Sequence, residues 1–382
     1  MRFVPLYAVA LLGLVVSSCF DGGDDSPSST VRPPAAEALD AVLYKRVASR
    51  DELSVLGVAT GLQSGNVSRV EVMTGHLSSP EHVFWSGMTI TALTGNAGLR
   101  FRSQGAELSP LRTIRLPWKA GLWNAQPSRD GRLIAIEPAR SCGKGCTAAS
   151  SRIYVGSSDG SGIRRVASGS LAGWTPDGRV LYWTRAHSTL MSFDLGNGKR
   201  TALLSRRVLD AFPSGRSTKI GASAWSADGL YVAFYAFGLF SSQRGIFDTV
   251  VLAHADGRVI RVLRSPYVIS MVAWSPQGHR LAYTTSGFPT PHELFVLDVP
   301  RGRPIRLYAT PRHFDWVTWS PDGRWLLLDD PNAGFHNVGP GERPPGRWRL
   351  VPASGTEAVR SLPRLGFHPV WCCPPGPFAL RG

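Results

Sequence analysis

Short apolar runs separated by turns rich in glycine, proline and aspartate recur along most of the chain. In the clearest copies, an apolar run ends at a tryptophan, a Ser-Pro-Asp-Gly-type turn follows, and a second apolar run begins. Proline fixes φ, aspartate bonds its own backbone and glycine accepts a positive φ, so this pattern predicts a tight β-hairpin. Five copies are clear, and they span residues 125–137, 173–184, 224–236, 273–285 and 318–330.

Two weaker copies at 84–95 and 370–382 extend the series, and the spacing is roughly 48 residues. The tryptophan position is held by Trp85, Trp174, Trp225, Trp274, Trp319 and Trp371, while Pro127 takes it in the second copy. The turn aspartate is Asp130, Asp177, Asp228 and Asp322. We interpret both sets as structural, with the tryptophans wedged between neighbouring repeats and the aspartates closing the turns.

A second strand–turn–strand pattern without the tryptophan alternates with the first. Its copies lie at 52–74, 99–116, 152–168, 190–204, 249–263, 293–308 and 347–362. Two hairpins per repeat make four strands, which is the content of one propeller blade. The chain is therefore predicted to be all-β and to form a single β-propeller of seven four-stranded blades. Six or eight blades remain open, because the first and last copies are degenerate.

The series begins with a hairpin of the second kind and ends with one of the first kind. We therefore expect two strands from residues 52–74 and two from 367–382 to share one blade. Such a blade would close the ring and remove the exposed edges of a linear array.

The tryptophan-centred repeat resembles the repeats of TolB-like propellers. Trp274-Ser275-Pro276 and Trp319-Ser320-Pro321-Asp322-Gly323 carry the resemblance, which covers about residues 50–382 as repeats. It implies the propeller fold and no more specific role. TolB proteins have six blades and an N-terminal α/β domain for which this chain has no room, and related peptidases add a hydrolase domain that is missing here.

The first residues indicate export and a lipid anchor. Met1-Arg2 precedes the uncharged run 3–18, which is shorter than the roughly 20 residues of a spanning helix and is typical of a signal peptide. Val16-Ser17-Ser18-Cys19 resembles the bacterial lipobox, in which the cysteine thiol carries diacylglycerol. A plain secretory signal or an uncleaved anchor is the alternative.

These features divide the chain into a signal peptide (1–18), a polar lipid-anchored tether (19–42) and a propeller (43–382). Acylation of Cys19 by two or more chains such as palmitate makes membrane attachment stable.

The absence of aspartate after Cys19, where Phe20 stands, favours the periplasmic side of the outer membrane in a Gram-negative cell. In other bacteria, we expect the outer face of the plasma membrane.

Four further cysteines suggest disulfides in an exported protein. Glycines between Cys142 and Cys146 let that segment fold back into a small loop disulfide, although cross-pairing, a redox pair or a metal site stays open. Cys372 and Cys373 are adjacent, where a bridge is strained. They would form a second disulfide or stay as free thiols.

The net charge of +15 raises nucleic acid as a partner, but the basic residues are scattered. We expect no nucleic-acid binding, and favour a cationic surface that meets a protein, an anionic glycan or lipid head groups. We expect a monomer.

The longest irregular insertion, 329–347, is the candidate recognition loop. Its side chains of interest are Asn332, Phe335, His336, Asn337 and Arg343. We find no catalytic constellation, no metal motif and no cofactor motif, so the sequence favours a non-enzymatic scaffold that binds a protein or glycan through one propeller face. The alternative is an enzyme that uses the central channel, either a lactonase-like hydrolase or a quinone-type dehydrogenase.

Overall fold

The computed structural model describes the strands and short turns of the repeats. The described residues are 42–47, 54–60, 62–64, 68–73, 82–86, 89–94, 97–104, 107–118, 122–138, 152–184, 189–205, 219–242, 245–264, 268–286, 292–311, 316–330, 347–363 and 367–371. All the described strands, β1 to β28, belong to one compact unit.

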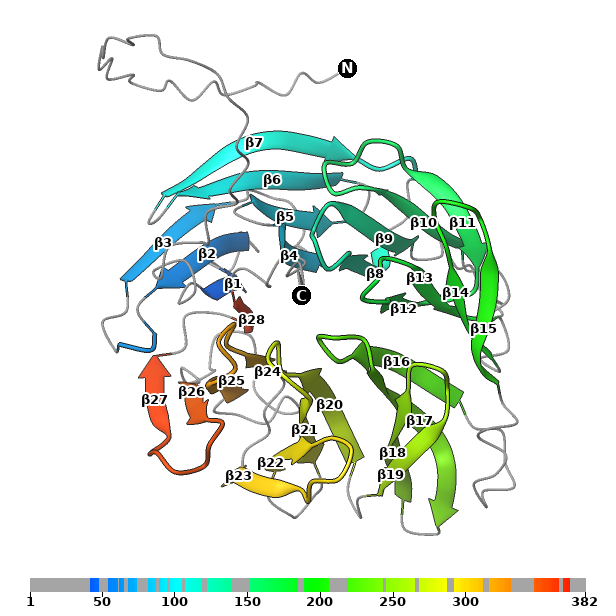
Figure 1. Ribbon diagram of the computed structural model, residues 1–382. Helices are drawn as coiled ribbons and strands as arrows, with labels where there is room; N and C mark the ends of the chain where they lie inside the picture. Colours follow the sequence, from blue (N-terminus) through cyan, green and yellow to red (C-terminus); the bar gives the residue numbers. More distant parts are fainter. Residues whose placement is uncertain are drawn as a thin grey trace, which may run out of the picture. The chain divides into compact units, whose positions relative to one another are not determined.

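The strands form seven four-stranded antiparallel sheets, here numbered 1 to 7 in ring order (Figure 1). Sheet 1 holds β28 (Phe367–Trp371), β1 (Val42–Val47), β2 (Ser54–Thr60) and β3 (Ser68–Met73). Sheet 2 holds β4 (His82–Ser86), β5 (Thr89–Thr94), β6 (Ala97–Gln104) and β7 (Glu107–Arg115). Sheet 3 holds β8 (Leu122–Pro127), β9 (Leu133–Pro138), β10 (Arg152–Ser157) and β11 (Arg164–Ser168).

The remaining sheets follow the same order along the chain. Sheet 4 holds β12 (Ser170–Trp174), β13 (Val180–Trp183), β14 (Thr189–Phe193) and β15 (Arg200–Ser205). Sheet 5 holds β16 (Lys219–Trp225), β17 (Tyr231–Ser242), β18 (Gly245–His254) and β19 (Val259–Arg264). Sheet 6 holds β20 (Val268–Trp274), β21 (Arg280–Ser286), β22 (His292–Asp298) and β23 (Ile305–Thr310). Sheet 7 holds β24 (Trp316–Trp319), β25 (Trp325–Asp330), β26 (Arg347–Pro352) and β27 (Arg360–Pro363).

Each sheet contacts the next, and the series closes on itself. The first strands of successive sheets meet from β4 and β8 onward to β20 and β24, and β24 contacts β28 of sheet 1. Sheet 1 in turn meets sheet 2 through β3 and β7. The prediction of an all-β propeller is therefore confirmed.

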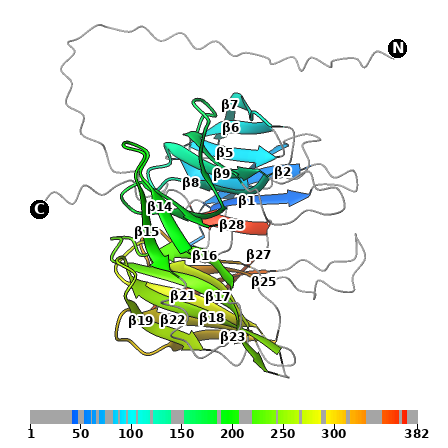
Figure 2. The ribbon, with the colours of Figure 1, turned by 90° about the vertical axis from the view of Figure 1, so that its right-hand side faces the viewer.

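Sheet 1 closes the ring, but its strands divide differently from the expected two and two. Three strands come from the N-terminal side, and β28 alone comes from the C-terminal side (Figures 1 and 2). The segment 42–47, VLYKRV, is rich in β-forming side chains and pairs with both β2 and β28. It therefore takes the second place in the sheet, which the sequence interpretation had given to residues after 371.

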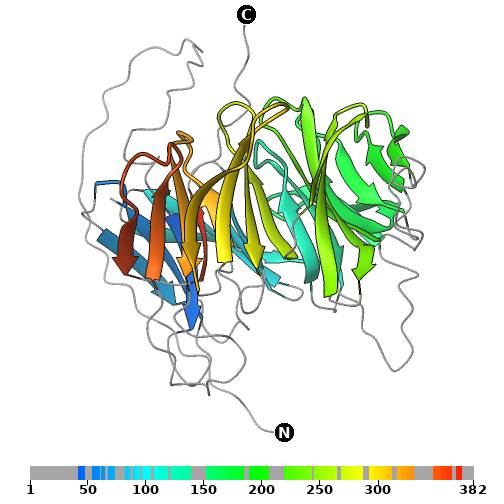
Figure 3. The ribbon, with the colours of Figure 1, turned by 90° about the horizontal axis from the view of Figure 1, so that it is seen from below.

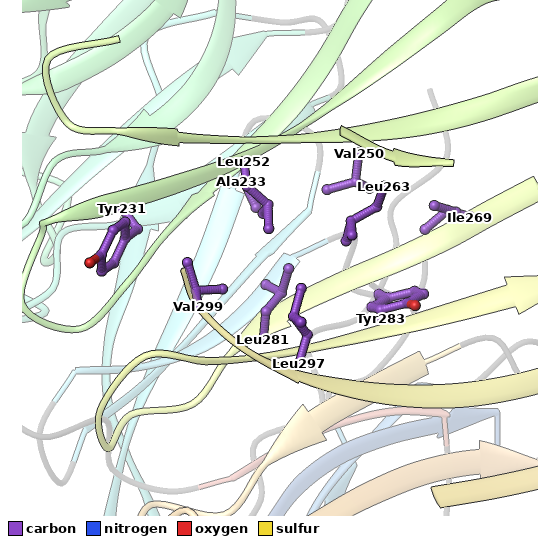
Figure 4. Close-up of a cluster of buried hydrophobic side chains, with 10 residues drawn as sticks. All are labelled: Tyr231, Ala233, Val250, Leu252, Leu263, Ile269, Leu281, Tyr283, Leu297 and Val299. Atoms are coloured by element: carbon purple, nitrogen blue, oxygen red, sulfur yellow. The ribbon is translucent and has the colours of Figure 1, made fainter. Parts of the chain in front are cut away.

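Buried side chains between neighbouring sheets hold the ring together. Figure 4 shows the cluster between sheets 5 and 6, where Leu252 and Ala233 of sheet 5 meet Leu281 and Leu297 of sheet 6. At the closing seam, Ala59 and Leu62 pack with buried tryptophans of sheet 7 and with Trp371. Because each sheet is apolar on both faces, it can bury area against two neighbours at once.

The short turns that join first to second strands, and third to fourth strands, gather at one end of the strands (Figure 3). We call this end the motif face, because it carries the Ser-Pro-Asp-Gly turns. The opposite end holds the residues that flank the expected recognition loop. In sheet 7, Trp319 of β24 pairs with Leu326 of β25 next to the motif-face turn. Asp330 of β25 pairs with Arg347 of β26 at the opposite end of the sheet.

Candidate functional site

The Ser/Thr-x-Asp turn of four repeats is a closed hydrogen-bond unit. In sheet 7, the Ser320 hydroxyl donates to Asp322 Oδ1 at 2.5 Å and accepts from the Trp325 backbone nitrogen at 2.9 Å. Asp322 also accepts from the backbone nitrogen of Arg324 at 3.1 Å. Such side-chain bonds to the local backbone are what Asx and Ser turns supply.

The same unit recurs in sheets 3, 4 and 5. Ser128 and Ser226 donate to Asp130 and Asp228 at 2.6 and 2.7 Å, and Thr175 donates to Asp177. The four turn aspartates therefore act on the fold, by fixing the start of each second strand.

Two of these carboxylates have pKa values below the usual range. Partial burial raises the pKa of Asp177, but hydrogen bonds from Arg179 and Thr175 outweigh it and the pKa falls. Burial likewise raises the pKa of Asp228, and bonds from His279 and Ser226 bring it below its ordinary value. His279 belongs to the turn of sheet 6, so its contact with Asp228 joins the turns of two neighbouring sheets.

Three of the repeat tryptophans also join neighbouring sheets. The indole Nε1 of Trp319 donates to the Ala273 carbonyl at 2.9 Å, and that of Trp274 donates to the Ala224 carbonyl at 2.8 Å. Trp174 donates to the Gln126 carbonyl at 2.9 Å. In each case the acceptor precedes the repeat's tryptophan position in the previous sheet.

Trp225 and Trp371 break this pattern. The Nε1 atom of each is buried and has no hydrogen-bond partner in the described part of the chain. By analogy, Trp225 would donate to the carbonyl of Gly173, but β12 has a register shift between Leu171 and Gly173, and Gly173 has a φ of 137°. The local backbone there differs from that of the other inner strands.

All five of these tryptophans line one pocket at the motif-face end of the inner strands. Its volume is about 510 Å³, within the range of roughly 300–1,000 Å³ of ligand sites. Four prolines complete much of the wall: Pro127, Pro176, Pro276 and Pro321. Sheets 3 to 7 and sheet 1 contribute the described lining residues.

Arg129 is the one charged residue among the described residues that line the pocket. Its guanidinium donates to the carbonyl of Ala227, so it reaches from the turn of sheet 3 past sheet 4 to the turn of sheet 5. The pocket therefore has an aromatic and apolar wall with a single cation, and that cation is already engaged with the backbone.

Other arginines use their charge at the seams between sheets. Arg164 of sheet 3 donates to the Leu195 carbonyl of sheet 4 at 3.1 Å, and Arg261 of sheet 5 to the Gly302 carbonyl of sheet 6 at 2.7 Å. Arg360 of sheet 7 donates to the Gln63 carbonyl beside sheet 1. Part of the excess of basic residues thus serves the fold.

Several residues singled out in the sequence lie outside the described residues. These are Cys19, Cys142, Cys146, Cys372, Cys373, Asn332, Phe335, His336, Asn337 and Arg343. Trp85 lies in β4, but its side chain is outside the described part. The sequence located the pocket's tryptophans, yet it carried no signal for which indole groups stay unpaired, because that depends on the carbonyls of the neighbouring sheet.

Within the strands and turns that the structure describes, no cluster of three histidine, cysteine or acidic residues could hold a metal ion. We also find, in the same part of the chain, no helix long and apolar enough to cross a membrane.

No protein-family model matches the chain, and no curated protein matches it in sequence. Solved structures resemble it in fold. A candidate 6-phosphogluconolactonase from Bacteroides uniformis is 12% identical with a TM-score of 0.51, over 85% of this chain and 97% of that chain. The dihydro-heme d1 dehydrogenase NirN is 10% identical with a TM-score of 0.53, over 88% and 76%. A candidate TolB protein from Agrobacterium tumefaciens is 17% identical with a TM-score of 0.46, over 74% and 94%. At these identities the likeness shows the fold alone, and that fold is the β-propeller.

Proposed function

We propose that the protein is a binding scaffold of the cell envelope, anchored through Cys19, which holds a protein partner against its motif face. The pocket lined by five repeat tryptophans is the observation that carries this proposal. We also propose that the tryptophan-centred repeat of this chain belongs with the TolB-like repeats, because it carries the Trp-Ser-Pro-Asp-Gly pattern.

The chemistry of the pocket suits recognition. Tryptophan and arginine are the side chains most enriched among residues that dominate protein interfaces, because they bury much apolar area and keep a polar donor. Here Trp174, Trp274 and Trp319 are held by hydrogen bonds between sheets, and turns beside them are closed by their own hydrogen bonds. A partner would therefore meet a preorganised surface, and few side chains of the pocket would lose conformational entropy on binding.

The location is a separate part of the proposal and has its own test. The uncharged run 3–18 and the lipobox-like segment before Cys19 support export and lipidation. Cys19→Ser should move the protein from the membrane fraction to the soluble fraction of cells. A Cys142→Ser variant is the matched control and should stay with the membrane. Membrane-bound Cys19→Ser protein would contradict lipid anchoring.

Photo-crosslinking in cells tests the binding face. A photoreactive residue placed at Leu230, which is 53% exposed on the motif turn of sheet 5, should capture a partner. A second probe at Arg324, exposed on the turn of sheet 7, should capture the same one. The comparison probe at Arg347 lies at the opposite end of sheet 7, beside the expected recognition loop.

A shared adduct from Leu230 and Arg324 supports the motif face. Adducts from Arg347 alone would place the contact on the opposite face and overturn this part of the proposal. Three probes without any adduct, in cells that express the protein at normal levels, would overturn the scaffold itself.

A further inference from the structure

We propose that the pocket takes a proline-rich segment of a partner protein, whose carbonyl oxygens accept hydrogen bonds from the indole groups of Trp225 and Trp371. This inference rests on the proposed scaffold function and names the chemistry of its ligand.

The two unpaired indole groups are the starting point. Both Nε1 atoms are buried without a partner in the described chain, and both residues line the pocket. Trp371 is only 4% exposed, so its N–H group has lost its water without gaining an acceptor. A buried donor left unpaired is unfavourable. A small turn of the indole ring that brings the N–H group to the pocket surface would let an acceptor of the ligand remove that cost.

Their places in the ring define the shape of the ligand. Trp225 belongs to sheet 5 and Trp371 to sheet 1, and sheets 6 and 7 lie between them. Those two sheets contribute Trp274 and Trp319, whose N–H groups are already bonded to Ala224 and Ala273. A ligand that reaches the N–H groups of both Trp225 and Trp371 must therefore be extended. Between them it would contact the rings of Trp274 and Trp319, whose N–H groups are already bonded.

The remaining polar groups argue against a ligand rich in donors. The hydroxyls of Thr175 and Ser226 are bonded to their turn aspartates, and Arg129 is bonded to a backbone carbonyl. No carboxylate is found among the described residues that line the pocket. The lining also holds the amide of Gln126 and the hydroxyls of Ser275 and Thr318, but most of it is apolar. A matching ligand therefore carries acceptors and few N–H groups.

A proline-rich segment has these properties. Proline has no backbone N–H, keeps its carbonyl acceptor and presents an apolar ring. In the polyproline II conformation it is extended before binding, which lowers the entropy lost on docking against aromatic side chains. An ordinary peptide would bring one N–H per residue into a pocket with few side-chain acceptors, namely the amide oxygen of Gln126 and the hydroxyls of Ser275 and Thr318.

Calorimetric titration of the full-length protein in mild detergent tests the inference. The probe is an acetylated and amidated hexaproline peptide, and the comparison peptide is a Gly-Ser hexamer with the same ends. Trp225→Phe and Trp371→Phe keep an aromatic ring and remove the N–H, and each should weaken hexaproline binding about three- to tenfold. Trp118→Phe is the matched control, because Trp118 Nε1 is also buried and unpaired but lies outside the pocket lining.

Binding of hexaproline alone, weakened in both pocket variants and unchanged in Trp118→Phe, supports the inference, provided that circular dichroism shows all variants folded. Equal binding by all variants overturns it. Motif-face crosslinks in cells together with no hexaproline binding would overturn the proline chemistry and leave the scaffold function standing. Binding that emerges only after residues 374–382 are removed would overturn an external partner, because that segment holds Pro374, Pro375 and Pro377 and would itself be the occupant.

Discussion

The indole nitrogen of Trp319 donates a 2.9 Å hydrogen bond to the backbone carbonyl of Ala273, and this bond crosses from sheet 7 to sheet 6. Trp319 is 5% exposed, and the guanidinium of Arg280 lies 5.7 Å from the centre of its ring. In three repeats, at Trp174, Trp274 and Trp319, the tryptophan of the sequence motif thus bonds one sheet to the next, so this bond stabilises the ring rather than a single sheet.

Replacing Trp319 with Phe should therefore destabilise the protein. The change keeps most of the apolar contact, but removes the donor to Ala273, and we expect a loss of about 1–3 kcal/mol in the free energy of unfolding. Trp225→Phe removes an indole donor that has no partner in the described chain, so it should cost less than Trp319→Phe. Urea unfolding of both variants measures the difference, and equal losses would contradict the assignment of the bond.

The turn of sheet 7 should depend on one hydroxyl group. Ser320 is fully buried, and its Oγ accepts from the backbone nitrogen of the buried Trp325. Ser320→Ala leaves that N–H unpaired and should cost about 1–3 kcal/mol of unfolding free energy. Ser354→Ala is the control, because Ser354 is exposed and its hydroxyl bonds the side chain and the backbone nitrogen of nearby Thr356. A loss for Ser354→Ala as large as that for Ser320→Ala would show that the turn unit is not the cause.

Stability in acid should depend on Asp228. Its pKa is lowered in the folded chain from the usual 3.8, so the charged carboxylate stabilises the fold above that pH. This contribution is lost as the pH falls through the lowered pKa. Asp228→Asn should therefore lose less stability than the wild type between about pH 5 and pH 2, by about 0.2–1 kcal/mol for a partly exposed pair. Denaturant midpoints across this range test the sign, and a steeper decline in the variant would contradict it.

The closing seam should be sensitive to Arg360. Its guanidinium donates to the Gln63 carbonyl and lies 4.7 Å from the centre of the Trp325 ring, so it ties sheet 7 to the chain of sheet 1. Arg360→Met should lower the free energy of unfolding by about 1–2 kcal/mol, through the lost bond and cation–π contact. Arg303→Met removes the same charge from an exposed turn and should change stability by less than about 0.5 kcal/mol. Thermal unfolding of the Arg360→Met and Arg303→Met variants checks this prediction. Equal losses would show that the lower net charge, and not the contact at the closing seam, is the cause.

The closing sheet shows where a local pattern misleads. The turn motif led us to place two strands after residue 367, because every other tryptophan is followed by a second strand. Instead, β1 pairs with both β28 and β2, since backbone hydrogen bonding accepts any β-forming segment that reaches the edge. A six-residue strand without a turn motif beside it carries little signal of its own.

Local chemistry along the sequence determined the repeats, their strands and their turns. The hydrogen bonds that join Ser320 to Asp322 and to Trp325 span only a few residues, so the conformation of this turn does not depend on distant parts of the chain. The tertiary structure alone decided which strand closes the ring and which indoles keep a free N–H. Those outcomes depend on carbonyls about one repeat away, such as Ala273 for Trp319, and on a backbone irregularity at Gly173 that follows from strand pairing. Trp319 and Trp225 occupy the same place in the repeat, but only the packed ring gives one indole an acceptor and leaves the other without a partner in the described chain.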